Sequence, residues 1–254
     1  MNNKQIPIMT HLIAGYPDLE TSYQTAKALA ENGAGILEIQ FPFSDPSADG
    51  PTIQAACNLA LESGFKVAQG FDLVTRLHAE FPTVPIFLMS YASLVFTPGV
   101  ENFCQRSVAA GVRGLIIPDL SPGDDEGLYA LGASMGLSIV PVIVPTITPR
   151  RLQQILELKP QHLYTAIRTG ITGVDSEITP ELLGFLDKLK TTGAQIMAGF
   201  GIVNSEQVRF IAPHVDYPVV GSALVRTVTR LAPQGPQAVY QAIGQQLREL
   251  NRGS

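Results

Sequence analysis

The sequence predicts an α/β protein folded as a single (β/α)8 barrel, the TIM-barrel fold, over residues 1–254. Short apolar runs alternate with longer helical patterns from end to end, and no Ser/Gly/Pro-rich linker divides the chain. The 254 residues shared among eight repeats give about 32 residues each, which suits a βα unit. A doubly wound open sheet is the alternative. It is disfavoured because no G-x-G-x-x-G turn follows the first strand and because a closing helix follows an eighth strand.

Eight apolar runs are expected to form the strands of the barrel. They are rich in Ile, Val and Leu and nearly continuous, which is typical of parallel strands that are covered on both faces. In chain order they occupy residues 6–14, 35–41, 84–91, 114–120, 138–144, 162–168, 195–200 and 216–220. Parallel neighbours need a crossover connection, so helices are expected between them.

Helical patterns fill the intervals between these runs. The first has apolar or small residues at every third or fourth position, and Asp18 before it is an expected N-cap, as Asn204 is further along. Helices are expected at residues 19–32, 52–62, 71–81, 100–110, 152–158, 180–190, 205–211, 223–228 and 236–250. Two of them are additions to the repeat: one short helix after the second strand, and a short phosphate-binding helix after the eighth.

Composition and charge exclude several classes of protein. Only 15% of the residues are charged, well below the roughly 25% of an average soluble domain. The net charge is −5 and no run of Lys and Arg occurs, so nucleic acid and anionic membranes are not expected partners. The apolar run at residues 6–14 is too short for a membrane span or signal core.

Cysteine and histidine usage predicts a cytoplasmic protein without a metal site. Cys57 and Cys104 lack C-x-x-C spacing and are expected to be buried free thiols. The four histidines are scattered in no metal-binding pattern, and His162 is expected to be packed or hydrogen-bonded. No G-x-S-x-G or Cys/His arrangement suggests a covalent nucleophile, which leaves acid–base chemistry.

Glu38 is the first candidate catalytic residue. It interrupts the otherwise apolar second strand, where period-2 alternation puts it on the same face as Gln40. A carboxyl group in the mouth of a barrel is partly desolvated, which raises its pKa towards the range useful for acid–base catalysis. The alternative is a structural Glu that pairs with a buried Arg.

Two aspartates follow Glu38 in an unusually long polar loop, residues 42–50. Asp45 and Asp49 stand in a proline-stiffened stretch at the carboxyl end of the strand, where barrels carry their active sites. Two carboxylates in separable environments can divide proton transfer from the stabilisation of a cation. The alternative is ordinary turn chemistry, because Asp-Pro and Asp-Gly are turn formers.

Glycines at the ends of the later strands predict a phosphate site. Gly201 follows the seventh strand, Gly221-Ser222 follows the eighth, and a Gly-containing stretch at 168–173 follows the sixth. Barrels commonly bind phosphate at these places through backbone N–H groups and the start of a short helix. A single glycine pair would more often be a turn.

Residues 37–51 make the chain resemble a known family. They read L-E-I-Q-F-P-F-S-D-P-S-A-D-G-P, which is similar to the tryptophan synthase α subunit pattern L-E-[LIV]-G-[LIVM]-P-[FY]-S-D-P-x-A-D-G-P. The likeness extends to A-G-Y-P-D at 14–18 and P-D-L at 118–120. It implies a barrel lyase that cleaves indole-3-glycerol phosphate to indole and glyceraldehyde 3-phosphate.

The resemblance also implies a partner and roles for the carboxylates. Indole would pass to a β subunit, which carries pyridoxal phosphate, in an α2β2 heterotetramer; no cofactor is implied on this chain. Glu38 matches the catalytic glutamate, which protonates the indole ring and takes the glycerol hydroxyl proton. Asp49 matches the aspartate that binds the indole N–H, and Asp45 matches a loop residue linked to β-subunit contact.

The same resemblance assigns residues to the substrate. It places an active-site tyrosine at Tyr164 and a closing-loop threonine at Thr172. The loop at 169–178 reads as a mobile lid, with a flexible crossover as the alternative. Phosphate contacts are implied at Gly173, Gly201, Gly221 and Ser222.

Five positions depart from the family pattern. Gln40 stands where glycine is typical, and His11 stands where a hydrophobic pocket residue is common. Ser47 replaces an aliphatic residue, Ser93 an asparagine and Ser121 a proline, the last two near the surface that meets the β subunit in the family.

The sequence leaves two other functions open. One is a different phosphosugar barrel enzyme, an isomerase or epimerase, which would share the phosphate site but would not need Asp49. The other is a weakly active α paralogue that mainly activates a β subunit.

Overall fold

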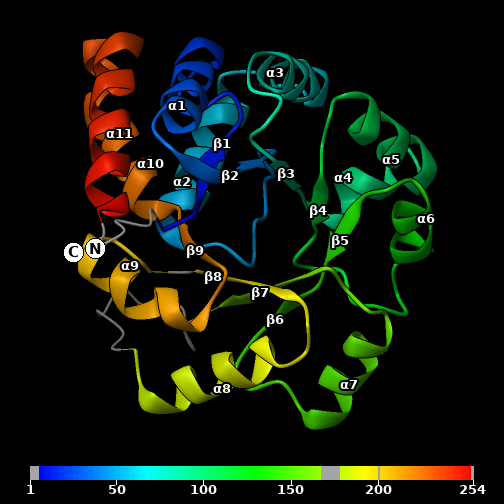
Figure 1. Ribbon diagram of the computed structural model, residues 1–254. Coiled ribbons are helices and arrows are strands. Elements are labelled where there is room, and N and C mark those ends of the chain that lie inside the picture. The colour runs from blue at the N-terminus through cyan, green and yellow to red at the C-terminus, as the bar shows by residue number, and fades with distance from the viewer. Residues whose placement is uncertain (1–5, 167–177, 200, 253–254) are drawn as a thin grey trace.

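Parallel strands form a nearly closed barrel surrounded by helices (Figure 1). The structure is a computed structural model that describes residues 6–166, 178–199 and 201–252. Within these residues nine strands pair in the order β5-β4-β3-β2-β1-β9-β8-β7-β6. The two strands at the ends of this order follow each other in the chain, so the sheet returns on itself. The predicted (β/α)8 architecture is confirmed.

The strands lie where the sequence predicts them, with one correction. They are β1 Ile8–Ile13, β2 Ala34–Gln40, β3 Ile86–Met89, β4 Gly114–Ile116, β5 Ser138–Val140, β6 Val142–Ile143, β7 His162–Ala166, β8 Gln195–Gly199 and β9 Tyr217–Val220. The single strand expected at 138–144 is wrong, because Pro141 divides it. Proline has no N–H for the ladder, and the part before it pairs with β4 while the part after it pairs with β7.

The helices also follow the prediction closely. They are α1 Leu19–Glu31, α2 Pro51–Glu62, α3 Val67–Glu80, α4 Ala92–Phe96, α5 Val100–Ala109, α6 Leu128–Ser134, α7 Pro149–Glu157, α8 Pro180–Lys190, α9 Ser205–Ile211, α10 Ser222–Leu231 and α11 Pro236–Asn251. Both predicted N-caps are present, since Asp18 accepts from Thr21 N and Asn204 accepts from Gln207 N. The sequence missed α4 and α6, which are too short to show a helical stripe.

The start of α3 is a second correction. It begins at Val67, four residues before the expected start at Phe71. The side chain of Gln69 accepts a hydrogen bond of 2.8 Å from Lys66 N, which satisfies an N–H that the first turn leaves without a helical partner.

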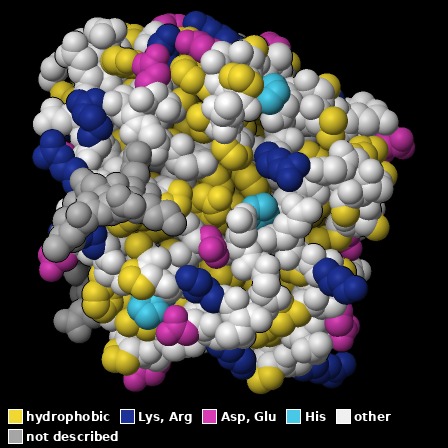
Figure 2. Space-filling view, in the orientation of Figure 1, with side chains coloured by type: hydrophobic (Ala, Val, Ile, Leu, Met, Phe, Trp, Pro, Cys, Tyr) yellow, Lys and Arg dark blue, Asp and Glu magenta, His cyan; other side chains and the backbone are white. Residues whose placement is uncertain are grey.

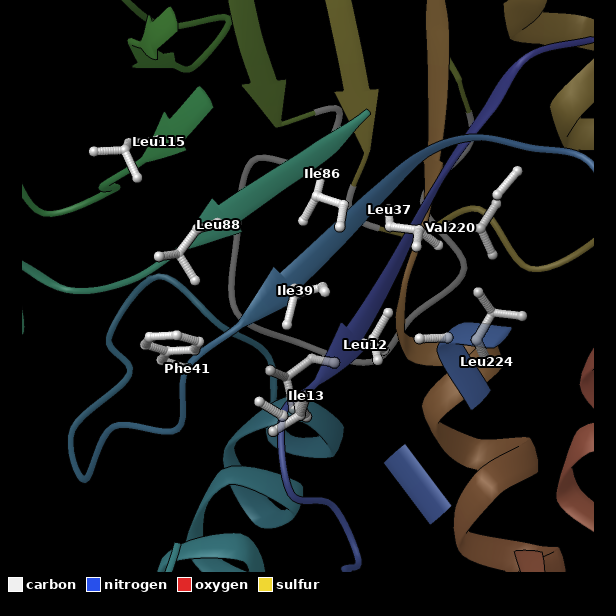
Figure 3. Packing of buried hydrophobic residues seen from close by; sticks show 14 of the residues in the cluster. Leu12, Ile13, Leu37, Ile39, Phe41, Ile86, Leu88, Leu115, Val220 and Leu224 are labelled. Atoms are coloured by element: carbon white, nitrogen blue, oxygen red, sulfur yellow. The ribbon is translucent and has the colours of Figure 1, made fainter. Parts of the chain in front are cut away.

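Alternate residues along each strand build two apolar layers. Outward-facing side chains pack under the helices: Figure 3 shows Leu12 of β1 with Leu37 and Ile39 of β2 in this layer. Inward-facing side chains form a separate cluster: Met9, Ile36, Phe87, Met89, Ile116, Val140, Tyr164, Met197 and Val219. Because both faces of the sheet are covered, few positions remain for charged residues, which accounts for the low charge content.

The surface agrees with the charge pattern of the sequence. On the face that Figure 2 shows, Lys and Arg side chains are interspersed with Asp and Glu. Among the described residues, no helix is both long enough and apolar enough to cross a membrane.

Phe41, at the end of β2, provides a test of this packing. Its side chain is fully buried and meets the ring of Phe71 edge-on, with the centroids 5.1 Å apart. We expect Phe41→Ala to lower the free energy of unfolding by about 3–5 kcal/mol, because the change leaves a cavity under the helices. Urea unfolding followed by circular dichroism measures it.

Phe210 is the matched control, since 51% of it is exposed on α9. Phe210→Ala should change the free energy of unfolding by about 0.5 kcal/mol or less. Equal effects of the two substitutions would contradict the assignment of Phe41 to the core.

Candidate active site

Glu38 lies inside the barrel on β2, and a histidine stands beside it. The strand register pairs His11 of β1 with Glu38, and Nδ1 of His11 lies 3.2 Å from Oε2 of Glu38. Among the described residues neither carboxylate oxygen has a well-formed hydrogen bond, and the contact is an ion pair when His11 is protonated. In the part of the chain that the structure describes, the charged neighbour of Glu38 is therefore a histidine, not the buried Arg of the alternative interpretation.

The two carboxylates of the site alter the titration of His11. Burial, the largest single effect, lowers its pKa, but the charges of Glu38 and Asp49 together with polar interactions with Glu38 and Gln40 raise the pKa above the ordinary value of 6.5. A protonated imidazole is thus favoured next to Glu38.

Asp49 lies at the end of the loop after β2 and is only 7% exposed. Two donors meet on one of its oxygens: Nε2 of Gln40 and the hydroxyl of Tyr91 each lie 2.8 Å from Oδ2. Burial raises the pKa of Asp49 above its ordinary 3.8, although the charge of His11 and the two donors counteract the effect. Because both donors meet on Oδ2, Oδ1 is the oxygen that remains for a ligand.

The loop that carries Asp49 is fixed by contacts with the next βα unit. Phe43 stacks on the ring of Tyr91 with the centroids 5.0 Å apart, and Ala48 N donates to the Tyr91 hydroxyl over 3.2 Å. On the helix side, Nε2 of Gln54 donates to the carbonyl of Asp49 over 2.8 Å. These contacts hold the carboxylate of Asp49 in place, as a preorganised site requires.

The thiol of Cys57, on α2, contacts the side-chain amide of Gln40. Its Sγ lies 3.5 Å from Nε2 of Gln40. Burial raises the pKa of the thiol to about 12, so the thiol stays protonated at neutral pH. Both cysteines are buried and free, as predicted.

Tyr164 faces the two carboxylates from β7. It is 5% exposed and belongs to the inner cluster. Burial first, and then the charges of Glu38 and Asp49, raise its pKa well above the ordinary value. A Cβ at Gly199 would lie 3.3 Å from the Tyr164 hydroxyl, so a glycine at this strand end leaves room for the ring. The structure brings Tyr164, Glu38 and Asp49 together.

The predicted phosphate residues lie at the ends of neighbouring strands. Gly201 follows β8, and Gly221 is the N-cap of α10 after β9, with Ser222 as the first helical residue. Gly201 has a φ of 122°, which L side chains rarely adopt. The pairing of β8 with β9 puts these residues at the same edge of the sheet.

Other predicted residues have different placements. Thr172 and Gly173, with most of the lid at 169–178, lie outside the described residues. Asp45 is exposed in the loop after β2 and accepts a 2.7 Å hydrogen bond from Ser44, so it lies at the surface, apart from the buried carboxylates. His162 is hydrogen-bonded as expected: Nδ1 lies 2.8 Å from Ser138 Oγ.

Sequence reasoning missed two side chains of the site. Tyr91 and Gln40 hold Asp49, and neither was a candidate, although both stand at the carboxyl ends of strands. Gln40 gave a signal as a departure next to Glu38. Tyr91 gave only its position after an apolar run.

Fold and site together define the class of protein. Two buried carboxylates and a buried tyrosine lie at the carboxyl ends of the strands of a (β/α)8 barrel, where barrel enzymes carry their active sites. A family model described as tryptophan synthase alpha chain matches residues 1–253. The chain belongs to this family, which implies a lyase.

Similar proteins agree over nearly the full length. The chain is 37% identical to the tryptophan synthase alpha chain of Aquifex aeolicus over 97% of this chain and 92% of that one. It is 38% identical to that of Helicobacter hepaticus over 89% and 87%. A solved structure of the tryptophan synthase α2β2 complex from Pyrococcus furiosus matches with a TM-score of 0.88 and 30% identity, over 97% of this chain and 98% of that one.

The raised pKa of Asp49 predicts a pH-dependent effect on stability. The folded state binds the Asp49 proton more tightly than the unfolded state does, so above the raised pKa the ionised carboxylate opposes folding. We expect Asp49→Asn to raise the Tm near neutral pH, with a gain that shrinks as the pH falls through the raised pKa. Thermal unfolding at a series of pH values measures this.

The control is Asp72→Asn at an exposed position of α3. Its Tm should follow that of the wild type at every pH. A lower Tm for Asp49→Asn at neutral pH would show that the burial of its charge is not the dominant effect.

Proposed function

We propose that this chain cleaves indole-3-glycerol phosphate to indole and glyceraldehyde 3-phosphate. The observation that carries the proposal is the pair of buried carboxylates in separate environments. Glu38 stands beside His11 with no well-formed hydrogen bond among the described residues, whereas Asp49 is held by Gln40 and Tyr91. The first suits proton transfer, and the second suits a fixed negative charge.

The reaction needs one proton added to the indole ring and one removed from the glycerol chain of the substrate. Glu38 as an acid protonates C3 of indole, and Asp49 stabilises the positive charge on the ring nitrogen by accepting its N–H at Oδ1. The bond between C3 and the glycerol chain then breaks, and its electron pair restores the aromatic ring. The ionised Glu38 takes the proton of the adjacent hydroxyl, which becomes the aldehyde. The carboxyl group of Glu38 is thereby regenerated.

The phosphate would bind at the other side of the mouth. Backbone N–H groups at Gly201, at Gly221 and at the start of α10 suit an anion because the positive end of the helix dipole points there. Ser222 adds a hydroxyl donor. Thr172 and Gly173 belong to the same proposal through the family resemblance. Tyr164 would line the space between the phosphate and the ring.

We further propose a β subunit as the partner that receives the indole. The α2β2 complex of Pyrococcus furiosus is similar to this chain in its α subunit, and the exposed loop with Asp45 offers a contact. Pyridoxal phosphate would belong to that β subunit. A cytoplasmic location suits two free thiols.

Glu38→Gln tests the proposed acid–base role. It keeps the size of the side chain but cannot exchange a proton, so indole release from indole-3-glycerol phosphate should fall by about 100-fold or more. Indole is measured by extraction and absorbance, with and without a β subunit. Binding of indolepropanol phosphate, measured by calorimetry, should persist in the variant.

The outcomes separate the functions that the sequence leaves open. Normal turnover by Glu38→Gln would overturn the proposed mechanism. Binding of plain sugar phosphates with no preference for the indole analogue would favour an isomerase or epimerase. Activation of a β subunit without indole release would indicate an activator.

Gln40→Leu tests the support of Asp49. Without its amide, Oδ2 of Asp49 keeps only the Tyr91 donor. We expect the kcat of indole release to fall by about 10-fold, because a hydrogen bond to a charged group contributes roughly 1.5–3 kcal/mol. The matched control is Gln24→Leu, which removes an exposed hydrogen bond between Gln24 and Glu20 on α1. Unchanged kinetics for Gln40→Leu would mean that Tyr91 alone positions Asp49.

A further inference from the structure

His11 occupies a place in the site that the proposed reaction does not use. Its side chain is 7% exposed and that of Glu38 is fully buried, with the ion contact of 3.2 Å between them. The contact joins two paired positions of adjacent strands, His11 on β1 and Glu38 on β2. Strand pairing therefore sets the contact, which does not depend on a loop.

The opposite side of His11 packs against the phosphate end of the site. A Cβ at Gly221 would lie 3.2 Å from Cβ of His11 and 3.4 Å from Cγ and Cδ2 of its ring. Contacts this close leave little space for a side chain at position 221. His11 thus lies between the carboxylate of Glu38 and the N-cap of α10.

Among the residues that the structure describes, the charged groups that face His11 come from one side. Glu38 of β2 is the nearer carboxylate, and Asp49 of the following loop adds its charge. On the side of α1 and α10, a small void of about 10 Å³ beside His11 is lined by apolar and hydroxyl side chains. Tyr164 of β7 faces the same two carboxylates and stays protonated, because its pKa is raised.

Both members of the pair have polar atoms left over. Within the described residues Nε2 of His11 and both carboxylate oxygens of Glu38 are buried and have no well-formed hydrogen bond. Buried polar atoms without partners are rare in folded proteins and are often explained by function. Here they belong to two side chains in contact with each other, with Nδ1 of His11 3.2 Å from Oε2 of Glu38.

We propose that His11 is a positioning residue that holds Glu38 through Oε2 and so presents Oε1 to the substrate. The inference rests on the proposed lyase function of Glu38. The imidazole holds the carboxylate in one orientation, so that the same oxygen faces the substrate when the proton is given to the ring and when the hydroxyl proton is taken. A glycine at position 221 leaves the space that the ring occupies.

The pH dependence of this arrangement has a definite sign. The pKa of His11 is raised by its partners, so the imidazolium is present below that raised pKa and is lost as the pH rises through it. The contribution of His11 to kcat should therefore decline on the alkaline side of the profile.

Two substitutions separate charge, hydrogen bonding and packing. His11→Phe keeps a ring against Gly221 but has neither donor nor charge, and we expect kcat to fall about 10-fold to 100-fold with a smaller change in KM. His11→Asn keeps a neutral N–H donor near the place of Nδ1. It should recover much of kcat and lose the alkaline decline that belongs to the imidazole. Unchanged kcat and pH profile in both variants would overturn the proposal.

A second measurement does not depend on turnover or on the stability of a His11 variant. The imidazole signals of ¹⁵N-labelled protein give the pKa of His11 in the wild type and in Glu38→Gln. We expect a lower pKa in the variant, because burial then acts against a weaker opposing charge. Asn substitutions of His78, His162 and His214, one at a time, identify the signals of the other three histidines, so that the remaining signal belongs to His11.

The titration of His11 and the release of indole together distinguish failure of the lyase function from failure of the positioning role of His11. If the wild type releases no indole, the lyase function fails, while a shift in the His11 titration still supports the positioning contact. If indole is released normally and the titration does not shift in Glu38→Gln, the lyase function stands and the role of His11 is overturned.

Discussion

The parallel pairing of β1 with β2 is the constraint on which the site depends. The same register that turns Leu12, Leu37 and Ile39 out under the helices turns His11 and Glu38 into the barrel. A slip of one residue would exchange the two faces and move the carboxylate among the helices. The apolar layer shown in Figure 3 therefore also positions the chemistry, since it allows only one register.

Burial of the Asp49 carboxylate lowers the stability of the fold, and neighbouring side chains reduce that cost. Burying Asp49 raises its pKa, so the protein holds a charge where burial disfavours it. Donors from Gln40 and Tyr91 reduce that cost, and the stack of Phe43 on Tyr91 holds the donors and the loop together. Such an arrangement trades stability for a charge that is already oriented when substrate arrives.

Most of the fold could be predicted from the sequence because the strands are apolar on both faces and the helices are long enough to show a stripe. The break at Pro141 and the short helices α4 and α6 could not, since one residue or two turns carry little periodic signal. Within the site, strand alternation placed Glu38 in the barrel. Local patterns could not supply the contacts of His11, Gln40 and Tyr91, which depend on how strands of different units meet.

The break at Pro141 divides the barrel into two segments, β1 to β5 and β6 to β9, with different proposed roles. Strands β1 to β5 carry the groups proposed to act on the indole ring, and β6 to β9 carry Tyr164 and the glycines proposed for phosphate. The five departures from the family pattern all lie at or before residue 121, in the first segment. The surroundings of the two carboxylates can therefore differ from the family pattern while the residues proposed for phosphate keep it, and the two halves constrain each other only where they meet, as His11 does with Gly221 and Tyr164 does with Glu38.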